Sequence, residues 1–168
     1  MTSTVVGEAS VLIERPVEEV FAFASDPHNE PKWHTDIVNV RHRTPGSSAD
    51  GDLPNSWGQE KTWITTVQFM GRKEYEVEVT AFELNHRIEF TTRTGPLLPI
   101  ATCLFKPSNG GTLFTRHTEV PLKGLYRLLQ PLMKWDGPRR QERFVQNLKR
   151  ILEGDGDSIE ARLDPRSA

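Results

Sequence analysis

The chain has 168 residues, of which 36% are hydrophobic, and a formal net charge of −2. This length fits one domain, and no run of about 18 apolar residues is present that would predict a transmembrane helix. The last fifteen residues account for the net charge, because 19 basic and 19 acidic side chains balance in the rest of the chain. A neutral body argues against a general nucleic-acid-binding protein.

The N-terminal part predicts a strand followed by two short helices. Residues Thr4 to Glu14 are rich in Val and Ile and predict the strand. Pro16 stands where a helix begins, because its missing N–H has no partner in a first helical turn. Asp26-Pro27 ends this helix. A second short helix or turn is expected from about Asn29 to Trp33.

The middle of the chain predicts six further strands. They span residues 36–43, 57–70, 73–84, 87–93, 98–106 and 112–120, and residues 44–56 form a loop by composition. Lys73 to Leu84 alternates apolar and polar residues with a period of two, which is typical of an antiparallel sheet with one dry face. Pro-Ser-Asn-Gly-Gly before the last strand predicts a hairpin turn.

The stretch from Leu122 to Glu153 is the longest helical pattern in the chain. Its apolar residues recur at spacings of three and four: Leu125, Leu128, Leu129, Leu132 and Met133, then Phe144, Leu148, Ile151 and Leu152. We expect a long helix whose whole apolar stripe lies across a curved sheet. A kink or break is expected near Pro131 and near Gly137-Pro138. The domain is predicted to span residues 1–153, followed by a disordered tail.

This order of elements carries several short motifs. They are the first strand leading into Arg15-Pro16-Val17-Glu18-Glu19-Val20-Phe21, then Asp26-Pro27, Pro31-Lys32-Trp33, Val79-Thr80-Ala81-Phe82-Glu83-Leu84, and Phe105-Lys106-Pro107 before Gly110-Gly111-Thr112. Together they resemble the START-related superfamily (SRPBCC), which includes polyketide cyclase/dehydrase proteins and birch-pollen-allergen-like proteins.

The resemblance implies an α+β helix-grip fold. In that fold a seven-stranded antiparallel curved sheet wraps around a long C-terminal helix, and two short helices follow strand 1. The gap between sheet and helix is a pocket for an apolar small molecule. Members include lipid and hormone carriers and cyclases acting on polyketides, and the family has no universal catalytic motif.

Ten residues are candidates for binding a ligand in such a pocket. They are Trp63, Val67, Phe69, Tyr75, Val77, Phe90, Arg116, Leu125, Leu129 and Met133. Ligand pockets are mostly apolar with a few placed polar groups. The alternative is that the apolar members form solid core.

Arg116 and His117 are neighbours on one predicted strand and must point to opposite faces. Arg116 shares its face with Phe114 and Val120, so we expect Arg116 to point inward, where it needs a carboxylate or an anionic ligand. The apolar loop from Thr94 to Ile100 is either a pocket lip, a patch for a membrane or partner, or a strand edge folded onto the core.

The sequence has no nucleophile elbow, Walker loop or dinucleotide fingerprint. His34 and Asp36 form either a general-base pair or a surface pair. Cys103 is expected to be a small core residue, and basic residues such as Arg140 are expected on a solvated helix face. The scattered histidines predict no metal site, and we expect no cofactor.

The sequence therefore predicts a protein that binds a small hydrophobic molecule of lipid-like, aromatic or polyketide-like chemistry. Alternatives are a cyclase or dehydratase using the same cavity, and an interaction or stress-related protein with a filled core. A single cysteine and no apparent secretory signal favour a cytoplasmic setting. We expect no nucleic-acid partner and no integral membrane association. A homo-oligomer is compatible with the sequence but not indicated by it.

Overall fold

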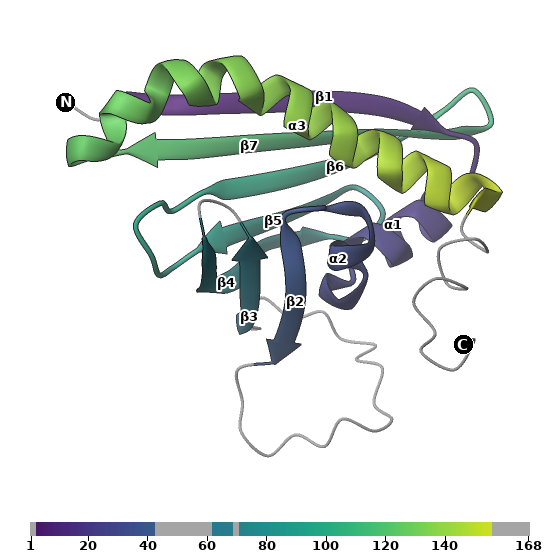
Figure 1. The fold of residues 1–168 in the computed structure, drawn as a ribbon. Coiled ribbons are helices and arrows are strands. Elements are labelled where there is room, and N and C mark those ends of the chain that lie inside the picture. The colour runs from purple at the N-terminus through teal and green to yellow at the C-terminus, as the bar shows by residue number, and fades with distance from the viewer. Residues whose placement is uncertain (1–2, 43–61, 69–70, 156–168) are drawn as a thin grey trace, which may run out of the picture.

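The computed structural model describes residues 3–42, 62–68 and 71–155, which form a curved antiparallel sheet gripping a long helix (Figure 1). The seven strands follow the order β1-β7-β6-β5-β4-β3-β2. Their bounds are β1 Ser3–Ile13, β2 Ile37–His42, β3 Thr62–Gln68, β4 Arg72–Glu83, β5 Arg87–Thr92, β6 Ile100–Ser108 and β7 Gly111–Leu122. The helices are α1 Val17–Ser25, η1 Pro27–Asn29, α2 Glu30–Trp33, η2 Gly124–Leu129, α3 Gln130–Arg150 and η3 Ile151–Asp155.

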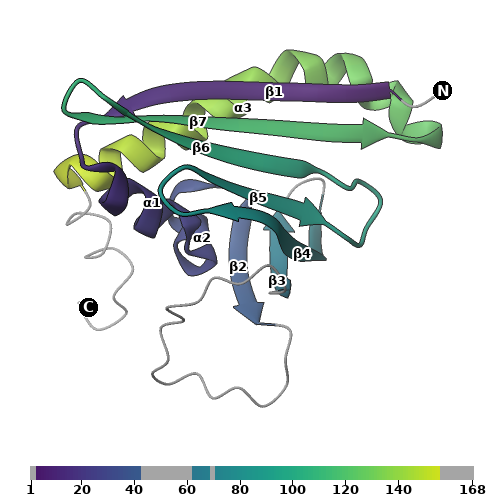
Figure 2. The same cartoon turned by 180° about the vertical axis from the view of Figure 1, so that it is seen from behind.

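The predicted helix-grip fold is confirmed. The sheet bends so strongly that β2 and β3 run across the direction of β1, β6 and β7, and both short helices lie at one end (Figure 2). Because β1 pairs with β7 along all 11 of its residues, the first and last strands lie side by side at one edge of the sheet.

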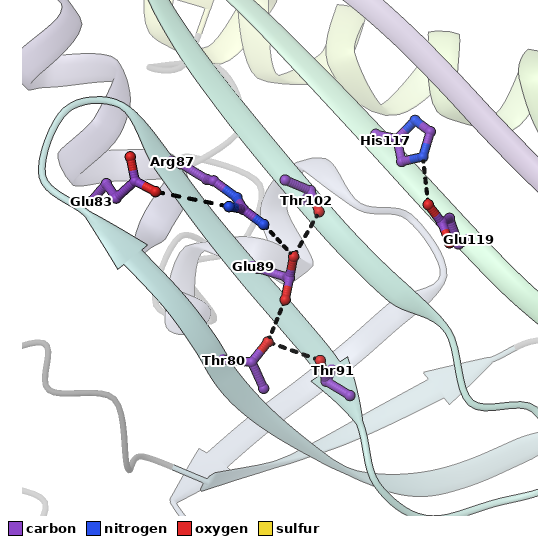
Figure 3. A network of polar contacts seen from close by, with 8 residues as sticks. All are labelled: Thr80, Glu83, Arg87, Glu89, Thr91, Thr102, His117 and Glu119. Atoms are coloured by element: carbon purple, nitrogen blue, oxygen red, sulfur yellow. Dashed lines mark hydrogen bonds and ion pairs between the residues drawn. The ribbon is translucent and has the colours of Figure 1, made fainter.

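Buried and exposed residues alternate along the strands, so one face of the sheet is buried and the other faces the solvent. Every second residue of β1 is buried, from Val5 to Ile13. On the opposite face of the sheet, Glu89 accepts hydrogen bonds from Thr80 at 2.8 Å and Arg87 at 2.6 Å (Figure 3). These hydrogen bonds hold the pKa of Glu89 below its usual value although partial burial opposes them. The outer face is therefore a solvated polar network, and the core lies on the concave side.

The C-terminal helical stretch is interrupted at one of the two predicted positions and continuous at the other. A 3-10 helix, η2, comes first, and Pro131 stands in the first turn of α3, so the predicted break near Pro131 is confirmed. At Gly137-Pro138 the alternative of a break is wrong, because α3 continues through both residues, and the alternative of a kink stays a prediction. A Cβ on Gly7 would lie 3.7 Å from the Gly137 carbonyl carbon, so β1 and α3 approach closely there. We attribute the unbroken helix to this packing.

The apolar stripe of that stretch is covered only in its second half. Phe144, Val145 and Leu148 are fully buried in the main core. By contrast, Leu125 and Leu128 are exposed, so the prediction that the sheet covers the whole stripe is wrong. The helix leaves the sheet towards its N-terminal end, and the two surfaces no longer meet there.

Several predicted features lie outside the described residues. These are the loop at 44–56, the beginning and end of the strand predicted at 57–70, and the tail beyond residue 155. Within the described residues, β6 begins at Ile100 rather than Leu98, and β7 continues to Leu122 rather than ending at Val120.

The two halves of the apolar stripe predict different responses to the same truncation. Leu148→Ala should lower the free energy of unfolding by about 2–5 kcal/mol, because it opens a cavity in the core. Leu128→Ala should change it by less than about 0.5 kcal/mol, because that side chain is exposed. Urea denaturation measures both. Equal losses would show that Leu128 is covered in solution.

Candidate functional site

A cavity of about 300 Å³ lies between the sheet and the first half of α3. This volume is at the lower end of small-molecule sites. The apolar side chains that line it come from both layers: Val5, Ile37, Val67, Val77, Phe90, Leu97, Pro99, Ala101, Val120, Leu129, Leu132, Met133 and Phe144. The space between helix and sheet is therefore solid at the α1 end and hollow at the other.

Most of the predicted ligand-binding residues line this cavity. They are Val67, Tyr75, Val77, Phe90, Arg116, Leu129 and Met133. Trp63 does not line it, because its side chain is buried against Ile37 and Val40. Leu125 projects away from it and is exposed. Phe69 lies outside the described residues. That the lining residues bind a ligand stays a prediction.

Arg116 is buried in the wall of the cavity, so the expectation that it points inward is confirmed. Its guanidinium carbon lies 5.2 Å from the ring centroid of Trp33 and 5.8 Å from that of Phe144. Its Nη1 lies 3.7 Å from Oε1 of Glu30, which is the carboxylate that a buried arginine needs. Burial raises the pKa of Glu30, although the positive charge of Arg116 opposes the shift.

A second arginine reaches the cavity from α3. Arg140 forms an ion pair with Asp36 and a longer one, 3.7 Å, with Asp136 one turn before it. The expectation of a solvated face is therefore wrong for Arg140. The sequence did contain a signal for this position: Arg140 precedes Phe144 by four residues, and residues four apart share one face of a helix. No sequence signal identified Glu30, which depends on the fold to meet Arg116.

His34 also lines the cavity, and its ring stacks on that of Phe144 at 3.9 Å between centroids. Burial lowers the pKa of His34 well below its usual value, and the positive charges of Arg116 and Arg140 lower it further. The imidazole is therefore neutral at pH 7. Because Asp36 lines the same cavity, the surface-pair alternative for His34 and Asp36 is wrong.

Four buried polar atoms on cavity-lining residues have no hydrogen-bond partner among the described residues. They are Nδ1 of His34, Nε of Arg116, Oγ1 of Thr118 and Oε1 of Gln141. Buried polar groups are normally hydrogen-bonded. Their concentration around one cavity leaves hydrogen-bonding capacity for a molecule within it.

The loop between β5 and β6 forms one edge of the cavity. Leu97 and Pro99 line it, while Gly95 lies against the ring of Tyr75. Gly95 has a φ of 108°, and a Cβ there would lie 2.4 Å from Cε1 of Tyr75. Only glycine permits this approach. Of the alternatives for this loop, the geometry favours a pocket lip.

Cys103 is a buried core residue, as expected, and burial raises the pKa of its thiol to about 12. Within residues 3–42, 62–68 and 71–155, no three His, Cys, Asp or Glu side chains come together as metal ligands. Over the same ranges, no helix is both long and apolar enough to cross a membrane.

Residues 4–153 match the sequence profile of the family described as "Polyketide cyclase / dehydrase and lipid transport". The chain belongs to this family. The START-related resemblance of the sequence is thereby confirmed. Among curated proteins, no sequence matches the chain.

Solved structures with the same fold include three distant relatives. A START superfamily protein from Mycobacterium smegmatis has a TM-score of 0.64 and 16% identity, over 92% of this chain and 98% of that one. Truncated norcoclaurine synthase from Thalictrum flavum has a TM-score of 0.64 and 13% identity, over 91% and 96%. A protein from Thermus thermophilus has a TM-score of 0.66 and 17% identity, over 88% and 97%. At these identities the likeness shows the fold alone.

The lowered pKa of His34 predicts a pH dependence of stability. As the pH falls below about 6.5, the unfolded chain binds a proton at His34 that the folded chain does not, so folding loses up to about 1.4 kcal/mol per pH unit. His34→Gln should therefore lose less stability than the wild type between about pH 7.5 and about pH 5.5. Urea denaturation at both pH values measures this.

The comparison between the wild type and His34→Gln removes the contribution of His117 to the pH dependence of stability. Burial alone would lower the pKa of His117, but hydrogen bonds to Glu8 and Glu119 raise it, so its effect on stability has the opposite sign. Both proteins carry His117, and its effect cancels. An equal loss in both would show that His34 does not resist protonation.

Proposed function

We propose that the protein binds one small, mainly apolar molecule in the cavity between the sheet and α3. The observation that carries this proposal is the cavity itself, which is lined by apolar side chains inside a domain whose other half is closely packed. Natural cores rarely leave such voids, because an unfilled apolar cavity costs stability. The association of the family with lipid transport supports the same function.

The charges around the cavity favour a ligand without a net charge. Two guanidinium groups face three carboxyl groups, those of Glu30, Asp36 and Asp136, and His34 is neutral. A buried charged ligand would require an unpaired partner, which is not available when each arginine already has a carboxylate. The four unpartnered polar atoms on the cavity-lining residues suit neutral hydroxyl or carbonyl groups on the ligand.

A matched pair of tryptophan substitutions tests the site. Val120 on β7 lines the cavity, whereas Val6 on the paired strand β1 faces the solvent. Val120→Trp should fill the cavity and weaken the binding of an apolar fluorescent dye by about tenfold or more, which corresponds to ~1.4 kcal/mol. Val6→Trp should leave the affinity within about twofold. Fluorescence titration of each folded variant measures both.

A control is needed because the dye can also bind the exposed leucines of η2. Leu128→Glu should leave dye affinity unchanged, since Leu128 does not line the cavity. Loss of dye binding in Leu128→Glu, together with retention in Val120→Trp, would contradict the proposal.

A second candidate function, proton transfer on the bound molecule, is favoured by His34. The imidazole lines the cavity and its Nδ1 has no hydrogen-bond partner among the described residues, so it is placed to accept a proton from the bound molecule. If the protein is an enzyme of this kind, His34→Gln retains ligand binding and stops the exchange of acidic C–H protons of the bound molecule with D2O. If C–H exchange in His34→Gln equals that of the wild type, His34 is not a general base, and the protein only binds and carries its ligand.

A further inference from the structure

The N-terminal end of the C-terminal helical stretch carries a cluster of exposed apolar side chains. Leu125 is 79% exposed, Leu128 74%, Leu132 58% and Trp135 64%. We call these four residues the mouth patch. Single exposed apolar residues are ordinary, but a cluster on one short stretch marks a contact surface.

The charged side chains around the mouth patch are nearly all basic. Lys123, Arg127, Lys134 and Arg139 are exposed between residues 123 and 139. The one acidic residue of that stretch, Asp136, lines the cavity and lies 3.7 Å from Arg140. The stretch thus has a local charge of +3 in a chain whose net charge is −2. This positive surface is complementary to an anionic partner.

The mouth patch adjoins the cavity. Leu132 belongs to both, and Leu129 and Met133 of the same helical stretch line the cavity wall. The start of α3 and the loop between β5 and β6, which forms the cavity lip, lie at the same end of the molecule in both views (Figures 1 and 2). A partner that covers the mouth patch would therefore meet the cavity opening.

We propose that the mouth patch docks the protein on an anionic lipid bilayer, with the cavity opening towards the lipid. Leucine and tryptophan side chains interleaved with lysine and arginine are typical of helices that lie in the membrane interface. The Arg139 guanidinium lies 4.2 Å from the Trp135 ring centroid, so the basic and apolar groups form one surface. An anionic bilayer satisfies both kinds of side chain, and a purely apolar protein partner leaves the four basic groups unmatched. This inference goes beyond ligand binding, because it names the surface on which the protein would take up its ligand.

Vesicle co-sedimentation with the full chain tests the proposal. Vesicles of phosphatidylcholine with about 30% phosphatidylserine should bind the protein at least about tenfold more strongly than phosphatidylcholine alone. Raising the salt from about 0.05 M to about 0.5 M should weaken this binding severalfold, because screening removes the electrostatic part. No binding to the anionic vesicles would overturn the proposal.

Two variants and a matched control locate the contact. Leu128→Glu and Arg127→Glu should each lose vesicle binding about tenfold or more while keeping the thermal midpoint. Leu84→Glu changes a leucine of similar exposure, 66% against 74% for Leu128, in the turn between β4 and β5, and should bind vesicles like the wild type. Equal losses in Leu84→Glu and Leu128→Glu would overturn the assignment of the surface.

Two further results separate this proposal from its competitors. A dimer in solution that Leu128→Glu dissociates, without vesicle binding by the wild type, would assign the mouth patch to a second copy of the chain and overturn the lipid contact. Val120→Trp should bind vesicles normally even though it fills the cavity. The failure of ligand binding and the failure of membrane docking are therefore distinguishable.

Discussion

The burial of Phe144 determines where the solid part of this domain ends and the hollow part begins. On its core side the residue packs with Val145 and Leu148, which anchor α3 to the sheet. On its other side the same ring stacks on His34 and lies near the guanidinium of Arg116. From Phe144 towards the start of α3 the cavity occupies the space between helix and sheet, apart from the close approach of Gly137 to Gly7 of β1. One aromatic ring thus joins the hydrophobic core to the polar end of the candidate site.

The polar end of the cavity depends on compensation between charges. A buried arginine without a carboxylate would be strongly destabilising, and Glu30 supplies that carboxylate from α2. Arg140 is paired in the same way with Asp36, just before β2. These pairs connect α2, β2, β7 and α3 around one cavity, so the ion pairs position the wall while the apolar side chains define the volume. The same pairs leave a cavity that is polar at one end and close to neutral.

Strand alternation and the Pro16 helix start are local signals, so the sequence predicted most of the strands and helices, while the resemblance to a known family implied the helix-grip arrangement. The inward orientation of Arg116 was predictable from its neighbours on the strand. The role of Glu30 was not, because it depends on Arg116, far away in the chain. Arg140 shares a helix face with Phe144, but its ion pair with Asp36 depends on the fold. The helical spacing of Leu125 and Leu128 predicted a common face, but spacing alone does not reveal whether a sheet is long enough to cover that face.

On the function proposed above, an apolar molecule binds inside the domain rather than on its surface. The most direct test is a crystal structure of the protein with an apolar dye bound. Binding inside the domain predicts density for the dye between the sheet and α3, in contact with Phe90 and Met133. Density only over the exposed leucines of η2, with the cavity closed by side chains, would contradict it.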